Sequence, residues 1–173
     1  MKVISRISDG LYKIEKILAV KLMTVMLGSI AGGVLFRHVF NNPLTWSDEL
    51  AVYMLVWLTF LGGSMSVKSL RAASLDLLFE RVSLRWKRIF LVVGYLCVMV
   101  FAGIVAYVAI QWVSNPSVKT QLSPGLKISM FLPYLAVPFG MICLLIHAFH
   151  HFLQGFVYKQ VSEGVGSEGG GAI

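Results

Sequence analysis

The sequence predicts an all-α integral membrane protein with four transmembrane helices, both termini in the cytoplasm (N-in/C-in) and an amphipathic interfacial helix at the N-terminus. Of its 173 residues, 57% are hydrophobic and 13% are charged, and the mean hydropathy is +0.79. These values lie outside the range of soluble domains. The net charge of +7 does not indicate nucleic acid, because the basic residues stand in short segments between long apolar ones.

Four segments are long and apolar enough to span a membrane. A helix needs about 20 mostly apolar residues to cross a bilayer core of roughly 30 Å, and it satisfies its own backbone polar groups there. The predicted spans are residues 17–39, 46–67, 88–113 and 128–151, within a transmembrane domain of residues 17–155. A signal peptide is a weaker interpretation of the first segment, because its apolar stretch is long for that role.

The distribution of lysine and arginine predicts the orientation, since cytoplasmic loops carry the excess of these residues. Arg37, Lys119 and Lys127 fall on one side of the predicted membrane, and the other twelve of the 15 basic residues fall on the opposite side. Both termini and the middle loop are therefore predicted to be cytoplasmic. The twelve are Lys2, Arg6, Lys13, Lys16, Lys21, Lys68, Arg71, Arg81, Arg85, Lys87, Arg88 and Lys159.

Three segments outside the spans have their own predictions. Residues 1–16 are expected to form an amphipathic helix on the membrane surface, the alternative being a frayed start of the first span. Residues 69–88 are expected to form a short interfacial helix or turn. Residues 156–173 are predicted to be a flexible Gly-rich tail, since they can bury little apolar surface. The apolar stripe behind the first prediction is Ile4, Ile7, Leu11, Ile14 and Leu18.

Asp48 and Glu49 are the acids attached directly to a predicted span, at the start of the second one. They are the first candidates for an ion site, but their place in the first helical turn favours a structural role. An acid there interacts with the positive end of the helix dipole, whereas coupling ions are usually held nearer the midplane. Arg37, across a short Asn/Pro turn, can pair with either acid. We expect these residues to fix the outer ends of the first two spans.

The four histidines raise the alternative of a haem-carrying membrane anchor subunit of an oxidoreductase. His38 is expected about 30 Å from the other three, because a helix rises 1.5 Å per residue, so one haem cannot join them. His147 and His151 share a helix face, but we find no acid or cysteine to complete a zinc site. We expect His147, His150 and His151 to reach the inner interface. No metal, no cofactor and no catalytic residue is predicted.

Small residues and prolines predict where the helices touch and bend. Small residues four apart or adjacent allow close helix contact, either within the protein or with a partner. Such sets are Gly28 and Gly32, Gly62 and Gly63, and Ala102 and Ala106. Pro133 and Pro138 should bend the fourth span, because each removes a backbone donor.

The stretch FRHVFNNPLTWSDELA (residues 36–51), followed by VWLTFLGG (residues 56–63), resembles the small membrane subunit of tripartite ATP-independent periplasmic (TRAP) transporters. The likeness extends over about residues 30–150. One departure is Arg-Ala-Ala-Ser at residues 71–74, where many members carry Gly-His-Ile. The matching positions Arg37, Trp46, Asp48 and Glu49 would organise the outer edge of the protein or contact partners.

The resemblance implies a multi-pass protein of the bacterial inner membrane that forms a heterodimer with a large TRAP membrane subunit. A periplasmic substrate-binding protein would deliver an organic acid, of dicarboxylate or sialic-acid type, for sodium-coupled uptake. The small subunit would be a non-catalytic brace in contact with membrane lipid. An oxidoreductase anchor is the main alternative, and an autonomous carrier is a third. The sequence does not specify the substrate.

Overall fold

The structure is a computed structural model that describes the backbone of residues 2–73 and 84–168 and the side chains of residues 5–69, 89, 90 and 92–153. Within these ranges it is helical apart from turns, loops and an isolated antiparallel bridge between Leu122 and Ser129. The all-α prediction is confirmed for this part of the chain. The helices are α1 (Lys2–His38), α2 (Thr45–Ala73), α4 (Leu84–Ser114), α5 (Pro116–Thr120), α6 (Phe131–Tyr134) and α7 (Ala136–Glu168).

In the described part of the chain, four helical segments are long and apolar enough to cross a membrane, as predicted. They are Ser5–His38, Thr45–Ser69, Val92–Ser114 and Phe131–Leu153. The cytoplasmic location of both termini stays a prediction. In the predicted interfacial segment at residues 69–88, residues 69–73 belong to α2 and 84–88 to α4, and residues 74–83 lie outside the described residues. Residues 169–173 of the predicted tail also lie outside them.

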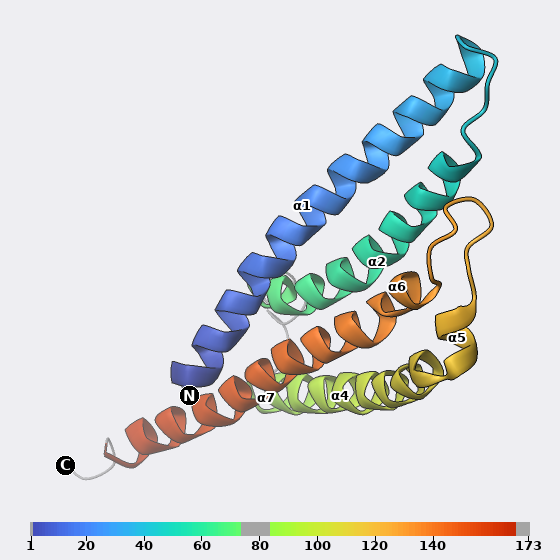
Figure 1. The fold of residues 1–173 in the computed structure, drawn as a ribbon. Coiled ribbons are helices and arrows are strands. Elements are labelled where there is room, and N and C mark those ends of the chain that lie inside the picture. The colour runs from blue at the N-terminus through green and yellow to red at the C-terminus, as the bar shows by residue number, and fades with distance from the viewer. Residues whose placement is uncertain (1, 74–83, 169–173) are drawn as a thin grey trace.

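The long helices form a row instead of a closed bundle. α1 packs against α2, α2 against α7 and α7 against α4, with a smaller contact between α1 and α7 (Figure 1). In the most apolar stretch of α7, 39% of the residues are buried, whereas in the corresponding stretches of α1 and α4 only 11% are buried. α7 is therefore central in the row, and α1 and α4 are peripheral. α1 starts at the end where α7 finishes. The turn after α1 and the loop after α5 lie together at the opposite end, here called the loop end.

α1 is one continuous helix of 37 residues, about 55 Å long at 1.5 Å per residue. The structure therefore shows no break between residues 2–16 and the first span. Whether the start of α1 lies on a membrane surface stays a prediction. The predicted apolar stripe is turned inward only in part, with Leu11 and Leu18 half-buried. Ile7 and Ile14 are 54% and 61% exposed, whereas Ser8 and Glu15 are buried against the other helices.

Local residue choices explain where the helices end. α1 stops before Asn41, which has a left-handed φ of 49°, a conformation that asparagine tolerates better than most residues. Asn115 caps α5, its side-chain oxygen accepting from the amide of Ser117. The fourth span is interrupted at Leu135, between α6 and α7, which lies between Pro133 and Pro138.

α7 continues to Glu168, well into the region where a flexible tail was predicted. Once a helix is formed, each added residue contributes one more backbone hydrogen bond, so the helix can extend past the end of its apolar segment.

The glycines that allow close contact within the protein are different from those the spacing indicated. An added Cβ at Gly28, Gly32, Gly62 or Gly63 would meet nothing within 4 Å in the described chain. Their predicted packing role therefore stays open for a partner. Gly140 of α7, in contrast, lies so close to α2 that a Cβ would come within 2.6–3.1 Å of Phe60. Ala102 and Ala106 are buried.

We expect Gly140→Ala to lower the thermal unfolding temperature of the detergent-purified protein. The new methyl group would push α2 and α7 apart, and overpacking of this kind costs about 1–3 kcal/mol. Gly94→Ala in α4 is the matched control, because its Cβ would meet open space and alanine favours the helix. Equal unfolding temperatures for the two variants would contradict this close contact.

Candidate functional site

The predicted acids of the second span lie in a polar cluster at the loop end, formed by Arg37, Asp48, Glu49 and Tyr53. The Nη2 atom of Arg37 lies 3.1 Å from Oδ2 of Asp48. This ion pair joins the end of α1 to the first turn of α2. Both side chains are more than half exposed. Exposed ion pairs contribute little stability, typically below about 1 kcal/mol, so this pair orients the helix ends more than it holds them together.

Glu49 has the more extensive contacts. Its Oε2 accepts hydrogen bonds from the backbone amides of Gly125 at 2.7 Å and Leu126 at 2.8 Å, and its Oε1 accepts one from the Tyr53 hydroxyl. Charge-assisted bonds of this kind are stronger than neutral ones. Glu49 therefore attaches the loop after α5 to the start of α2.

Gly125 is required for this attachment. A Cβ at this position would lie 2.5 Å from Glu49 Oε2 and 3.3 Å from both the Thr45 oxygen and the Trp46 Cα. Trp46 itself is 41% exposed at the surface of the first turn of α2. The four residues predicted to act at this edge thus lie together, three of them in polar contacts and Trp46 exposed.

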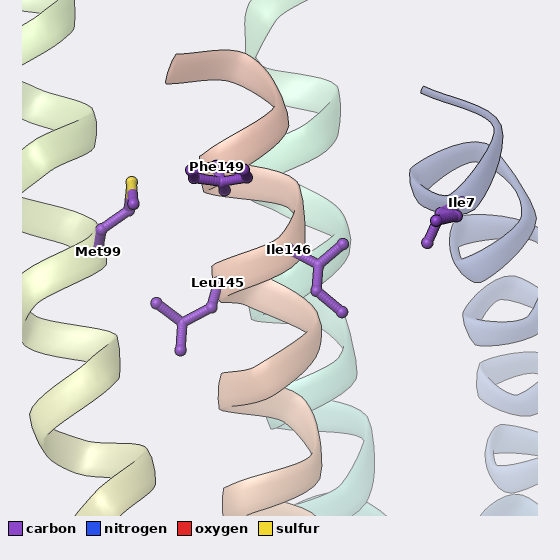
Figure 2. A pocket seen from close by; sticks show the side chains of 5 residues that line it. All are labelled: Ile7, Met99, Leu145, Ile146 and Phe149. Atoms are coloured by element: carbon purple, nitrogen blue, oxygen red, sulfur yellow. The ribbon is translucent and has the colours of Figure 1, made fainter. Parts of the chain in front are cut away.

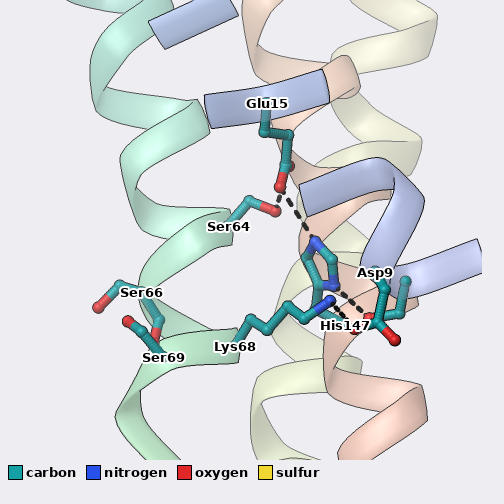
Figure 3. A network of polar contacts seen from close by, with 8 residues as sticks. Asp9, Glu15, Ser64, Ser66, Lys68, Ser69 and His147 are labelled. Carbon is teal, nitrogen blue, oxygen red and sulfur yellow. Dashed lines mark hydrogen bonds and ion pairs between the residues drawn. The ribbon is translucent and has the colours of Figure 1, made fainter. Parts of the chain in front are cut away.

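A second polar cluster lies buried toward the opposite end of the row and consists of Ser8, Glu15, Ser64 and His147; we call it the buried cluster. All four side chains are at most 1% exposed. His147 Nε2 lies 3.0 Å from Glu15 Oε2, and the Ser64 hydroxyl donates to Glu15 Oε1 at 2.7 Å (Figure 3). Ser8 Oγ lies 2.8 Å from His147 Nδ1. The cluster joins α1, α2 and α7.

The hydrogen bonds of the buried cluster are complete. Both carboxylate oxygens of Glu15 and both ring nitrogens of His147 have a partner. A buried charge or polar atom without a partner is costly, and removal of one partner would leave the others unsatisfied. The cluster therefore fixes the first part of α1 in one position on α2 and α7.

An ion pair lies next to the buried cluster, nearer the surface. Lys68 Nζ lies 2.7 Å from Asp9 Oδ1 and 5.1 Å from the centre of the Tyr12 ring. Lys68 is 15% exposed and Asp9 58%. This pair adds a second polar connection between α1 and α2 on one flank of the cluster (Figure 3).

The other flank of α1 faces an apolar groove. Ile7 of α1 lies on one side of α7 and Met99 of α4 on the other, with Leu145, Ile146 and Phe149 of α7 between them (Figure 2). Its lining contains almost no polar surface, so it can hold hydrocarbon and little else. The polar chemistry of this region is therefore confined to the buried cluster and the Asp9–Lys68 pair.

The buried cluster was missed by the sequence analysis, which expected His147 to reach the inner interface and found no acid near it. His147 is instead fully buried and bonded to Glu15. The two residues are 132 positions apart in the chain, so no local pattern connects them. The available signal was the seven-residue spacing of Ser8 and Glu15, which places both on one helix face.

Residues 26–157, about three quarters of the chain, match the family described as tripartite ATP-independent periplasmic transporters, DctQ component. The chain belongs to the DctQ family. The four hydrophobic helices together with this family make it a multi-pass membrane protein. Ser8 and Glu15 precede the matched region, whereas Ser64 and His147 lie within it.

Several relatives are similar to this DctQ-family chain. The C4-dicarboxylate TRAP transporter small permease protein DctQ of Rhodobacter capsulatus is 30% identical over 56% of this chain and 43% of its own length. The protein of the same name from Vibrio cholerae is 24% identical over 81% and 70%. The isethionate TRAP transporter permease protein DctMQ of Oleidesulfovibrio alaskensis is 24% identical over 63% and 18%. The matches thus cover less than half of the first and third relatives.

Family membership decides two questions that the sequence left open. The chain is a transporter component and not an enzyme. The alternative of an oxidoreductase anchor receives no support, because the relatives are transporter permeases. The structure also separates the histidines as expected, with His38 at the last position of α1 and His147 beside the start of α1.

We expect Glu49→Gln to loosen the loop after α5. The amide side chain keeps the size of glutamate but removes the negative charge that two backbone amides share. Hydrogen exchange at the amides of Gly125 and Leu126 should become at least about threefold faster. Asp48→Asn is the control, since its exposed pair with Arg37 should leave these amides unchanged; an equal effect of the two changes would contradict this assignment.

We expect Glu15→Ala to destabilise the protein strongly, by about 3 kcal/mol, because His147 and Ser64 lose their shared buried partner. Thermal unfolding in detergent measures the loss, and Lys16→Ala, an exposed change one residue away, is the control. The double variant Glu15→Ala/His147→Ala should lose less than the sum of the single losses. Additive losses would show that the two residues do not act together.

Proposed function

We propose that this chain is the small, non-catalytic membrane subunit of a TRAP transporter and braces a large transport subunit, with which it forms a heterodimer. The observation that carries the proposal is that the charged side chains of the two polar clusters bond to groups of the same chain. These side chains are Glu15, Arg37, Asp48 and Glu49. Such contacts stabilise a fixed helical frame, whereas an ion-translocating site needs groups that can release and rebind their ligand.

The open row of helices supports an accessory role. α1 and α4 each pack on one neighbour along most of their length, and their outward faces are rich in exposed apolar residues. Gly28 and Gly32 lie on such a face without a neighbour inside the described chain. Small residues on a membrane helix allow another helix to approach closely, which suits contact with a larger membrane subunit.

The proposed orientation places both termini in the cytoplasm and the loop end in the periplasm, in the bacterial inner membrane. It rests on the excess of lysine and arginine in the terminal and middle segments. In this orientation Arg37, Trp46, Asp48 and Glu49 would face the periplasm. They would stabilise the edge at which a large subunit or a periplasmic substrate-binding protein could approach.

The substrate we propose is an organic acid taken up with sodium ions. The names of the relatives include C4-dicarboxylate, isethionate and sialic acid, and these three share an anionic group. Substrate choice would belong to the binding protein and the large subunit.

We expect a tagged form of this chain to copurify from its native membrane with a larger membrane protein. The pair reconstituted in liposomes with a binding protein should take up an organic acid when a sodium gradient is applied. The chain alone should take up none. Uptake by the chain alone would contradict the brace proposal.

A variant with Arg37, Trp46, Asp48 and Glu49 all changed to alanine tests the loop end. We expect it to lower both copurification and uptake by at least about fivefold. Lys21→Ala, an exposed change within the first span, is the control. Unchanged assembly and uptake in the fourfold variant would contradict the role proposed for these residues.

A further inference from the structure

The buried cluster holds two titratable groups in direct contact, and the function proposed above uses them only as a fixed structural contact. Glu15 Oε2 and His147 Nε2 lie 3.0 Å apart, at 1% and 0% side-chain exposure. Ionisable side chains enclosed among membrane helices are rare, and they commonly take part in proton or ion binding. The question is therefore how many protons this pair holds and what changes when the number changes.

Three protonation states are possible for the pair. With no added proton, neutral His147 donates from Nε2 to the Glu15 carboxylate, Ser8 donates to Nδ1, and the pair carries a charge of −1. With one proton, both ring nitrogens of His147 donate, one to Glu15 and one to the Ser8 oxygen, and the net charge is zero. Both states satisfy every hydrogen bond that the structure shows. The neutral state also avoids a net charge in a medium of low dielectric constant.

A second added proton is different. If it binds Glu15 Oε2, two donors face each other across the 3.0 Å contact. If it binds Oε1, Ser64 must give up its role as donor to that oxygen. In either case the cluster carries a positive charge that no carboxylate balances, and an unpaired buried charge is strongly destabilising.

We propose that the cluster of Ser8, Glu15, Ser64 and His147 is a proton-binding site that holds α1 against α2 and α7 with at most one added proton and releases the start of α1 when it binds a second. The proposed release affects only the first part of α1. At the other end of α1, Ser29 donates to the Ser47 carbonyl oxygen at 2.7 Å and Arg37 pairs with Asp48, so the helix stays attached there while its first part moves away.

Other charges around the site do not cancel this effect. Asp9 and Lys68 balance each other in a close pair. The histidines nearby can only add positive charge on acidification, which favours release in the same direction. The ionisable groups near the cluster are Asp9 and Tyr12 of α1, Lys68 of α2, Tyr95 of α4, and Cys143, His150 and His151 of α7.

Hydrogen exchange on the full-length protein in lipid nanodiscs tests the proposal. The readout is the protection of the amides of residues 8–16, corrected for the intrinsic effect of pH on exchange. Between pH about 8 and 4, the range in which free imidazole and carboxyl groups change charge, we expect protection to fall by at least about tenfold. Protection at residues 29–37 should change much less.

Two variants identify the groups responsible. His147→Gln removes one titrating group but keeps an amide that can bond Glu15. Acidification can then no longer leave an unbalanced positive charge on the cluster, so the fall in protection of residues 8–16 should be much smaller in this variant. His150→Gln, one turn along the same helix, is the matched control and should keep the transition. An unchanged transition in His147→Gln, or no transition in the unmodified protein, would overturn the proposal.

Infrared difference spectroscopy provides a second measurement that does not require the histidine variant to fold. Acidification of the unmodified protein should produce a carbonyl band from a newly protonated carboxyl group, in step with the loss of protection. Glu15→Gln, which keeps the size of the side chain, should remove that band, whereas Asp9→Asn should retain it. A band that persists in Glu15→Gln would assign the proton to another group and overturn the site.

Discussion

Polar atoms enclosed by membrane helices must find their partners inside the protein, because hydrocarbon offers none. This constraint decides which face of α1 is turned inward. Lipid tails are as apolar as leucine, so Ile7 and Ile14 gain little by packing on other helices instead of lipid. Ser8 and Glu15 gain a great deal by meeting Ser64 and His147. The polar residues, and not the apolar stripe, therefore set the rotation of the first part of α1.

The two polar clusters attach α1 in physically different ways. At the loop end the Arg37–Asp48 pair is exposed, so water and salt weaken it, and the firmer contact is the Ser29 hydrogen bond to the Ser47 oxygen. The buried cluster is shielded from both. Its strength depends instead on the match between donors and acceptors, which the binding of a second proton would disturb.

Local features were predictable from the sequence, and long-range pairs were not. The four spans, the closeness of Arg37 to Asp48 and the prolines on either side of the break at Leu135 depend on residues near one another in the chain. The pairing of Glu15 with His147 required the relative position of α1 and α7, which no spacing rule supplies. Glycine patterns leave the contacting helix open for a related reason: spacing identifies a close-packing face but not what it contacts.

The row arrangement connects the fold with the role proposed for it. A closed bundle of four helices would hide the small residues of α1 and α2 among its own side chains, whereas a row leaves two broad apolar faces. Such a surface is stable in contact with lipid, and it also offers an interface on which another membrane protein can pack. α1, held at two separated points, then forms an edge that is stiff along its length and can be freed at one end only.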